Sequence, residues 1–255
     1  MMKFNYHTHT FLCNHAGGEI EEYVKQGIKM GLKTLGFADH VPVPFSCEHR
    51  SHFRMRTSQI SQYVDELVRL REKYRSDIRI LIGYEMEYYP REYDATLDFI
   101  NQYPCDYLIL GQHFINNEYD GVYMGSGTVN EENLKIYVDQ SIEGLKTGKF
   151  LYFAHPDLPI YTGDMDYYRH KMRKLCSFCN ENNIPLELNF LGLTTGRHYP
   201  KDEFWELVRE AGNRIILGCD AHNPNDVANP EQFKTAMKYL ERFGLSDRVI
   251  TDELI

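Results

Sequence analysis

The feature that most constrains the fold of this chain is a regular alternation of short apolar segments with amphipathic ones. Seven apolar runs have the character of strands, at residues 3–7, 33–40, 78–88, 105–113, 150–157, 184–190 and 214–222. Apolar residues also recur at helical spacing over residues 18–31, 58–74, 93–102, 130–146, 165–182, 202–211 and 231–243. The alternation therefore predicts βα units repeated along the chain.

The strands are nearly continuous apolar runs, which is typical of parallel strands covered by helices on both faces. The regular order favours a closed α/β barrel over an open sheet. At 255 residues, 42% of them hydrophobic, the chain can bury one full core. Although its length also permits two domains, we expect a single barrel domain over residues 1–255, because no Pro/Gly-rich linker divides it.

Net charge and apolar content limit the kinds of molecule that the chain is expected to bind. A formal charge of −9 argues against nucleic acid or an anionic membrane as the main partner. No signal peptide and no run of about 18 apolar residues is present, so we expect a cytoplasmic protein. The six cysteines are interpreted as reduced thiols, and Cys176 and Cys179 as buried helix residues; nothing here specifies an oligomeric state.

Histidines and carboxylates gather where the predicted strands end. His7 and His9 are two residues apart on an extended segment, so their side chains point to the same face, and the same holds for Asp220 and His222. Five further candidates end or follow other strands or the first loop: His15, His40, Glu85, His113 and His155. Because the active sites of α/β barrels form at the carboxyl ends of the strands, we expect these residues to meet there.

So many buried imidazoles would leave donors and acceptors unpaired unless a cation binds them. Nine candidate ligands exceed the four that one tetrahedral ion takes, so two or three ions are expected. A carboxylate such as Glu85 can bridge closely spaced ions, and a hydroxide shared between them would be a nucleophile at neutral pH. Imidazole and carboxylate ligands leave Zn, Mn and Fe all open.

Seven short motifs carry a resemblance to a known family. They are HTHT at 7–10, HA at 15–16, DH at 39–40, GYEMEY at 83–88, GQHF at 111–114, AHPD at 154–157 and CDAH at 219–222. In this order they resemble the motifs of the PHP (polymerase and histidinol phosphatase) superfamily. HTHTFLCNHA and the later GLTTGRHYP most resemble the stand-alone histidinol-phosphate phosphatases.

The resemblance implies a distorted (β/α)7 barrel, similar to a TIM barrel, that binds three divalent metal ions. It implies hydrolysis of L-histidinol phosphate, a small-molecule phosphate ester, in histidine biosynthesis. It also implies three ligand sets, carried over by residue: His7, His9, Glu85 and Asp220 for one ion, Glu85, His113 and His155 for a second, and His15, His40 and His222 for a third.

Other residues are candidates for contacting the substrate. A phosphate monoester would need a proton donor for its leaving alkoxide, for which Asp39 and Asp157 are candidates. Arg197 is the best candidate for a bidentate phosphate ligand, since it follows the sixth predicted strand. The weaker candidates are Arg54 and Arg56 in the loop over residues 41–57, His198, and, for the cationic groups of histidinol, Tyr119, Asp120 and Tyr123 in the loop over residues 114–129.

Three alternatives stay open. The chain could be a PHP phosphoesterase acting on a nucleotide, a sugar-like phosphate or phosphotyrosine, since the metal centre would be the same. It could be a non-catalytic PHP module like those joined to bacterial polymerases, although its acidic composition suits DNA poorly. It could also be a TIM-barrel amide hydrolase, a class that likewise begins with HxH.

Overall fold

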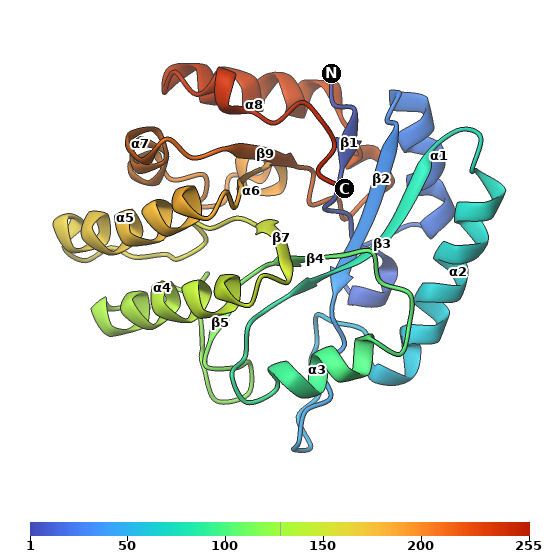
Figure 1. The fold of residues 1–255 in the computed structure, drawn as a ribbon, viewed down its shortest axis with the longest axis horizontal. Coiled ribbons are helices and arrows are strands. Elements are labelled where there is room, and N and C mark those ends of the chain that lie inside the picture. The colour runs from blue at the N-terminus through green and yellow to red at the C-terminus, as the bar shows by residue number, and fades with distance from the viewer. Residues whose placement is uncertain (128) are drawn as a thin grey trace.

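The computed structural model of the chain describes residues 1–127 and 129–255 and confirms the α/β barrel. Its main sheet has seven parallel strands in the order β1-β2-β3-β4-β7-β8-β9 (Figure 1). They are β1 (Phe4–Asn5), β2 (Thr34–His40), β3 (Arg79–Met86), β4 (Tyr107–Leu110), β7 (Phe150–Phe153), β8 (Leu186–Asn189) and β9 (Ile215–Gly218). Each predicted strand therefore occurs, although all seven are shorter than the predicted ranges.

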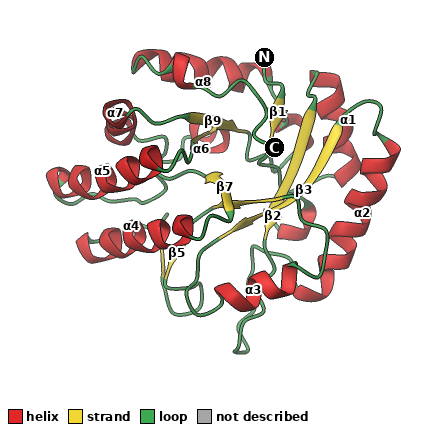
Figure 2. Ribbon diagram, in the orientation of Figure 1, coloured by secondary structure: helices red, strands yellow, loops and turns green. Residues whose placement is uncertain are grey.

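The helices lie around the outside of the strands (Figure 2). They are α1 (Ile20–Met30), α2 (Ile60–Lys73), α3 (Tyr93–Ile100), α4 (Glu131–Lys146), α5 (Met165–Glu181), α6 (Phe190–Thr195), α7 (Asp202–Ala211) and α8 (Pro230–Arg242). Cys176 and Cys179 are buried in α5. Within the described residues, no helix is both long and apolar enough to cross a bilayer.

A helix and a hairpin have no counterpart in the sequence prediction. Helix α6 follows β8 directly, where Asn189 caps it by accepting a hydrogen bond from the backbone N–H of Gly192. A two-stranded hairpin, β5 (Phe114–Ile115) and β6 (Val122–Tyr123), lies inside the loop predicted over residues 114–129; residue 128 of that loop lies outside the described part. The loop over residues 41–57 contains no helix or strand before η2 (Thr57–Gln59).

The barrel nearly closes between its first and last strands. Just beyond β1 and β9, Thr8 and Ala221 form a parallel bridge, with the His9 N–H donating to the Ala221 carbonyl at 3.0 Å. Asn5 adds a side-chain contact, because its Oδ1 accepts from the Cys219 N–H at 3.0 Å. Closure at this end of the barrel sets the HxH segment beside the Asp220–His222 segment.

Large side chains from alternate strand positions fill the barrel interior. Tyr6, Tyr107 and Tyr152 are all buried there, and the Tyr107 hydroxyl donates to the Tyr6 carbonyl at 2.6 Å. The C-terminal segment covers the amino end of the barrel, where the Leu254 N–H donates to the Tyr6 hydroxyl at 3.0 Å. The carboxyl end is thus the open end of the barrel.

The packing around Tyr107 predicts that the barrel interior tolerates no added atom at Gly83. A methyl group there would lie 2.5 Å from the Tyr107 ring, so the Gly83→Ala variant should lose about 1–3 kcal/mol of unfolding free energy. Urea titration with circular dichroism measures this loss. Gly127→Ala is the control, since no described atom lies within 4 Å of its added methyl, and equal stability of the two variants would contradict the packing argument.

Candidate metal centre

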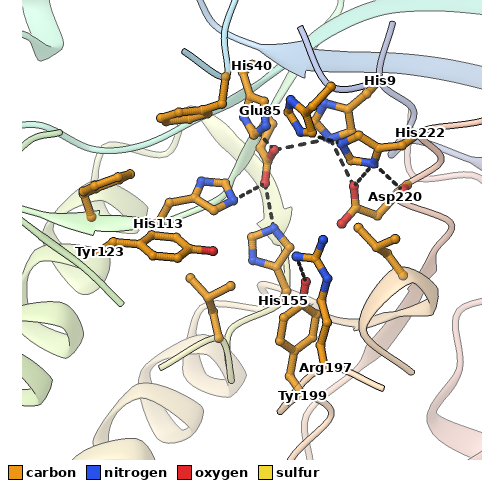
Figure 3. A pocket seen from close by; sticks show the side chains of 15 residues that line it. His9, His40, Glu85, His113, Tyr123, His155, Arg197, Tyr199, Asp220 and His222 are labelled. Carbon is orange, nitrogen blue, oxygen red and sulfur yellow. Dashed lines mark hydrogen bonds and ion pairs between the residues drawn. The ribbon is translucent and has the colours of Figure 1, made fainter. Parts of the chain in front are cut away.

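All nine predicted ligands meet at the open end of the barrel. They follow or end strands β1, β2, β3, β4, β7 and β9, except His15, which follows the short helix η1 (Phe11–Cys13). Eight of them line a cavity of about 350 Å³ (Figure 3). The ninth, His7, is fully buried and does not line it. Residues more than 200 positions apart in sequence are therefore neighbours here, as expected for a barrel active site.

Glu85 lies at the centre of the cluster (Figure 3). Its Oε1 is 2.7 Å from His155 Nε2 and 3.6 Å from His113 Nε2. Its Oε2 is 3.0 Å from His40 Nδ1 and 3.5 Å from His9 Nε2. Because its two oxygens face different histidines, this carboxylate has the geometry of a group that bridges two ions.

Asp220 faces the histidines of the first strand. Its Oδ1 lies 3.1 Å from His9 Nε2 and 3.5 Å from His7 Nε2. On its outer side, His222 Nε2 lies 2.9 Å from His15 Nε2. The site thus continues from buried carboxylates to a pair of histidines nearer the solvent.

The residues present fit divalent metal ions. Several buried atoms of the described cluster have no aligned hydrogen bond: His9 Nδ1, His40 Nδ1, Glu85 Oε2, His155 Nδ1 and Asp220 Oδ1. Six sets among the described residues have one potential ligand atom per residue within 4.8 Å of the others. They include His7, Glu85 and His155; His7, His9 and Asp220; His9, His40 and His222; Cys13, His15 and His222; and His9, Cys13 and Asp39. These His and Asp clusters are metal-binding groups in residue type and spacing.

The charges of the cluster support one another. Burial opposes ionisation of Glu85, but the neighbouring imidazoles, His113 foremost, lower its pKa well below the usual range. Burial also opposes protonation of His7, but the surrounding carboxylates, Glu187 foremost, raise its pKa well above the usual range. Since a metal ligand must be a neutral imidazole, ions that bind here would displace protons from His7.

Glu187 is a buried carboxylate that the sequence analysis missed. It lies on β8, and its Oε1 accepts from His7 Nδ1 at 2.8 Å, a contact that orients His7 Nε2 toward the cluster. Its Oε2 accepts from the backbone N–H of His155 at 3.0 Å and from Asn189 Nδ2 at 2.9 Å. The signal was an acidic residue inside the otherwise apolar run at 184–190.

The backbone conformation of two ligands gives Glu187 a second structural role. His155 and Asp220 have backbone φ angles of 32° and 47°. These angles are positive, and residues other than glycine seldom adopt positive φ. Glu187 bonds to the His155 backbone directly, and Asn189 Nδ2 donates to Asp220 Oδ2 at 3.1 Å. The two β8 side chains therefore hold both strained residues in place.

Arg54, one of the weaker candidates for contacting the phosphate, does not line the cavity. Its guanidinium is buried, donating to Glu118 Oε2 at 2.7 Å, to Glu87 Oε2 at 3.1 Å and to the Val41 carbonyl at 2.8 Å. Glu87 in turn accepts from His113 Nδ1 at 2.9 Å. Arg54 is thus committed to two carboxylates and supports His113 instead of facing the cavity.

The two candidate proton donors are also outside the cavity lining. Asp39 Oδ2 accepts from the backbone N–H and the hydroxyl of Thr10, and its Oδ1 from the His40 N–H. Asp157 Oδ2 accepts from the Lys201 N–H at 2.7 Å and from Trp205 Nε1 at 3.0 Å. Both carboxylates are buried and occupied in fixing local structure, so we assign neither to proton transfer.

Arg197 does line the cavity, and its side chain points in beside His155 (Figure 3). It donates to the Tyr199 hydroxyl at 3.4 Å and forms no ion pair with any described residue. Neighbouring His198 instead contacts the Leu158 carbonyl, a loop-packing contact, and Arg56 is exposed in its loop. Arg197 is therefore the one predicted substrate arginine that the structure brings to the cluster.

Aromatic and aliphatic side chains form the outer wall of the cavity. Phe53 and Phe114 stack at 13° with ring centroids 5.8 Å apart, and Tyr123 packs on Phe114 at 5.2 Å. The other two loop candidates face away, since Tyr119 donates to Glu92 and Asp120 pairs with Arg91. The cavity therefore combines a polar floor with an aromatic wall.

Comparison with known proteins gives consistent matches. The PHP domain model matches residues 5–190. The chain is 26% identical to a probable histidinol-phosphatase of Deinococcus radiodurans over 93% of this chain and 92% of that protein, and 23% identical to the histidinol-phosphatase of Bacillus subtilis over 89% and 96%. In fold it resembles the histidinol phosphate phosphatase of Lactococcus lactis, solved with zinc, L-histidinol and phosphate (TM-score 0.72, 21% identity, 95% and 94% covered).

The Glu187–His7 contact predicts weaker metal binding when the carboxylate is neutralised. Glu187→Gln should lower the affinity of the most tightly held ion by about 10–100-fold, because a carboxylate partner makes His7 a stronger ligand. Competition with a chelator, followed by elemental analysis, measures it. Glu210→Gln is the control, since Glu210 pairs with Arg173 on the surface; equal metal retention in both variants would contradict this role.

The Arg54 network predicts a stability effect in place of a direct effect on substrate. Arg54→Met leaves Glu87 and Glu118 buried without their cation and should cost about 3–5 kcal/mol of unfolding free energy. Chemical denaturation measures the loss, with Arg173→Met as the surface control. If Arg54→Met instead had normal stability but bound phosphate poorly, Arg54 would be a substrate-binding residue and this prediction would be wrong.

Proposed function

Because the chain belongs to the PHP domain family, whose curated relatives matched here are phosphatases, we propose that this phosphoesterase hydrolyses L-histidinol phosphate to L-histidinol and inorganic phosphate. One observation carries the proposal: a metal-binding cluster shares one cavity with an arginine that forms no ion pair within the described part of the chain. A phosphate monoester is a dianion that such a cavity would hold from both sides.

Three divalent ions, Zn, Mn or Fe, would be held by the ligand sets that the resemblance implies. His7, His9, Glu85 and Asp220 would hold the first, Glu85, His113 and His155 the second, and His15, His40 and His222 the third. When bound, these ions would neutralise phosphate charge and lower the pKa of water at the site. We propose that residues 1–255 act as one catalytic domain, since ligands come from both ends of the chain.

The chain's own residues would bind and orient the phosphate. Arg197 reaches the cavity from the loop after α6, and a guanidinium can donate two parallel hydrogen bonds to phosphate oxygens. The Tyr199 hydroxyl, 3.4 Å from Arg197 Nη1, positions that guanidinium. Arginine on one side and the metal cluster on the other would fix the phosphorus between them.

The aromatic wall supports a leaving group that carries a ring. The Phe53–Phe114 pair and Tyr123 offer ring faces on which an imidazole can stack, and their π faces attract a cationic ammonium group. Histidinol has both groups. Relatives named histidinol-phosphatase that match about nine-tenths of the chain support the same substrate.

A second candidate is an aryl phosphate ester. The same ring faces would accept a phenyl group, and the chain is also 24% identical to a protein of Clostridium acetobutylicum known only as a probable phosphatase. The two candidates differ in charge, because histidinol carries an ammonium group and a phenyl ester does not. Selectivity between them therefore reports on the substrate.

Phosphate release from matched esters tests the proposal. The metal-loaded protein should show its highest kcat/KM with L-histidinol phosphate, ahead of glycerol phosphate and an aryl phosphate. Arg197→Met should lower kcat/KM about 100-fold or more, because it removes a charged donor to the phosphate, while metal content stays unchanged. Arg173→Met, on the surface of α5, is the matched control.

Two results would overturn the proposal. Equal low rates on all three esters would separate this chain from histidinol phosphate, and a preference for the aryl ester would favour the second candidate. Asp220→Asn removes an anionic ligand. Full activity in this variant would show that catalysis does not depend on the metal-binding cluster.

A further inference from the structure

Negative charge is distributed unevenly across the ligand cluster. The Glu85 and Asp220 carboxylates have oxygens within 4.0 Å of ring nitrogens of His7, His9 and His155. Of the three histidines proposed for the outer ion, His40 also lies beside Glu85, with its Nδ1 3.0 Å from Oε2. By contrast, among the described residues no carboxylate forms an ion pair with His15, and only Asp220 forms one with His222. That contact joins His222 Nδ1, the ring nitrogen away from His15, to Asp220 Oδ1 at 3.4 Å.

The same two histidines face each other. Their Nε2 atoms are 2.9 Å apart, which presents both lone pairs to a common point. His15 Nδ1 donates to the Cys13 carbonyl at 2.8 Å and His222 Nδ1 to the Asp220 carbonyl at 3.0 Å. These contacts fix both rings with Nε2 available as a ligand atom.

Their supporting partners differ from those in the deeper part of the cluster. His7 and His113 donate to the carboxylates of Glu187 and Glu87, which makes them stronger ligands. His15 and His222 donate only to neutral backbone carbonyls. His15 is also exposed, so water competes for its ligand position.

From this asymmetry we propose that the ion shared by His15 and His222 binds weakly to the free protein and is held firmly only when phosphate enters the cavity. The inference rests on the proposed function, since it assumes that a phosphate group is what the cavity receives. Neutral imidazoles do not offset the repulsion from two neighbouring dications. A phosphate dianion supplies the negative charge that the protein omits at this point.

Linkage makes the effect reciprocal. If phosphate raises the affinity for this ion, the ion raises the affinity for phosphate by the same factor. The deeper ions, with the carboxylates of Glu85 and Asp220 beside them, need no such partner. The outer ion thus belongs to the substrate complex, whereas the deeper ions belong to the folded protein.

Metal counting with and without inorganic phosphate tests the inference. The full chain, loaded with Zn²⁺, is dialysed against graded chelator with or without phosphate, and bound metal is measured by elemental analysis. We expect about two ions per chain without phosphate and about three with it, and a rise of roughly tenfold or more in the outer ion's affinity.

Variants identify which ion responds. His15→Ala should abolish the phosphate-dependent increment while keeping the phosphate-independent ions. His170→Ala, which removes an exposed histidine from α5, is the matched control and should retain the increment. Loss of all metal in His15→Ala would contradict the inference, because it would show the outer ion to be integral to the cluster.

A tightly held third ion in the absence of phosphate would overturn the proposal. If Cys13→Ser then released that ion, the buried Cys13 thiolate, whose sulfur lies within 4.8 Å of ligand atoms of His15 and His222, would be the missing anion. Hydrolysis is scored separately. Phosphate-dependent metal uptake without hydrolysis of any ester refutes the proposed function alone, and hydrolysis without such uptake refutes this inference alone.

Discussion

The metal-binding cluster depends on the backbone bridge that joins the first and last strands of the barrel. Thr8 and Ala221 pair beyond the ends of β1 and β9, and this pairing is the reason that His9 and Asp220 lie 3.1 Å apart. Strand period sets the side chains of His7 and His9 on one face. Only closure of the barrel brings this face against the Asp220–His222 segment, so fold and site are fixed by the same contact.

Glu85 and Glu187 need space inside the barrel, and small residues provide it. A methyl group on Gly111 would overlap the Glu85 carboxylate, and one on Gly218 would overlap that of Glu187. Elsewhere the interior is filled by Tyr107 and other large residues, which leave no room for carboxylates. Large side chains therefore fill the amino end of the barrel, whereas glycines leave space for buried carboxylates at its carboxyl end.

Strand ends could be predicted from sequence because period and parallel pairing are local rules, and they located His40, Glu85 and His113 correctly at one edge. Side-chain pairs between residues far apart in sequence, which only folding brings together, could not be predicted. Its loop position makes Arg54 a candidate for contacting the phosphate, yet Glu118, from another loop, forms an ion pair with it. In the sequence Glu187 is a single acidic residue within an apolar run, and only the folding of β8 places it against His7. Neither partner lies near its target in sequence, and no local pattern records the pairing.

The groups that accept hydrogen bonds from the ligand histidines also affect how strongly each histidine binds a metal ion. Carboxylates behind His7 and His113 strengthen ligands deep in the cluster, whereas carbonyls behind His15 and His222 do not. A centre built with uniformly strong ligands would hold its ions whether or not a substrate were present, and its charge would already be balanced. With metal ions bound, an outer pair that faces no carboxylate between its Nε2 atoms would leave positive charge unbalanced beside Arg197, and this charge would draw a phosphate dianion into the cavity.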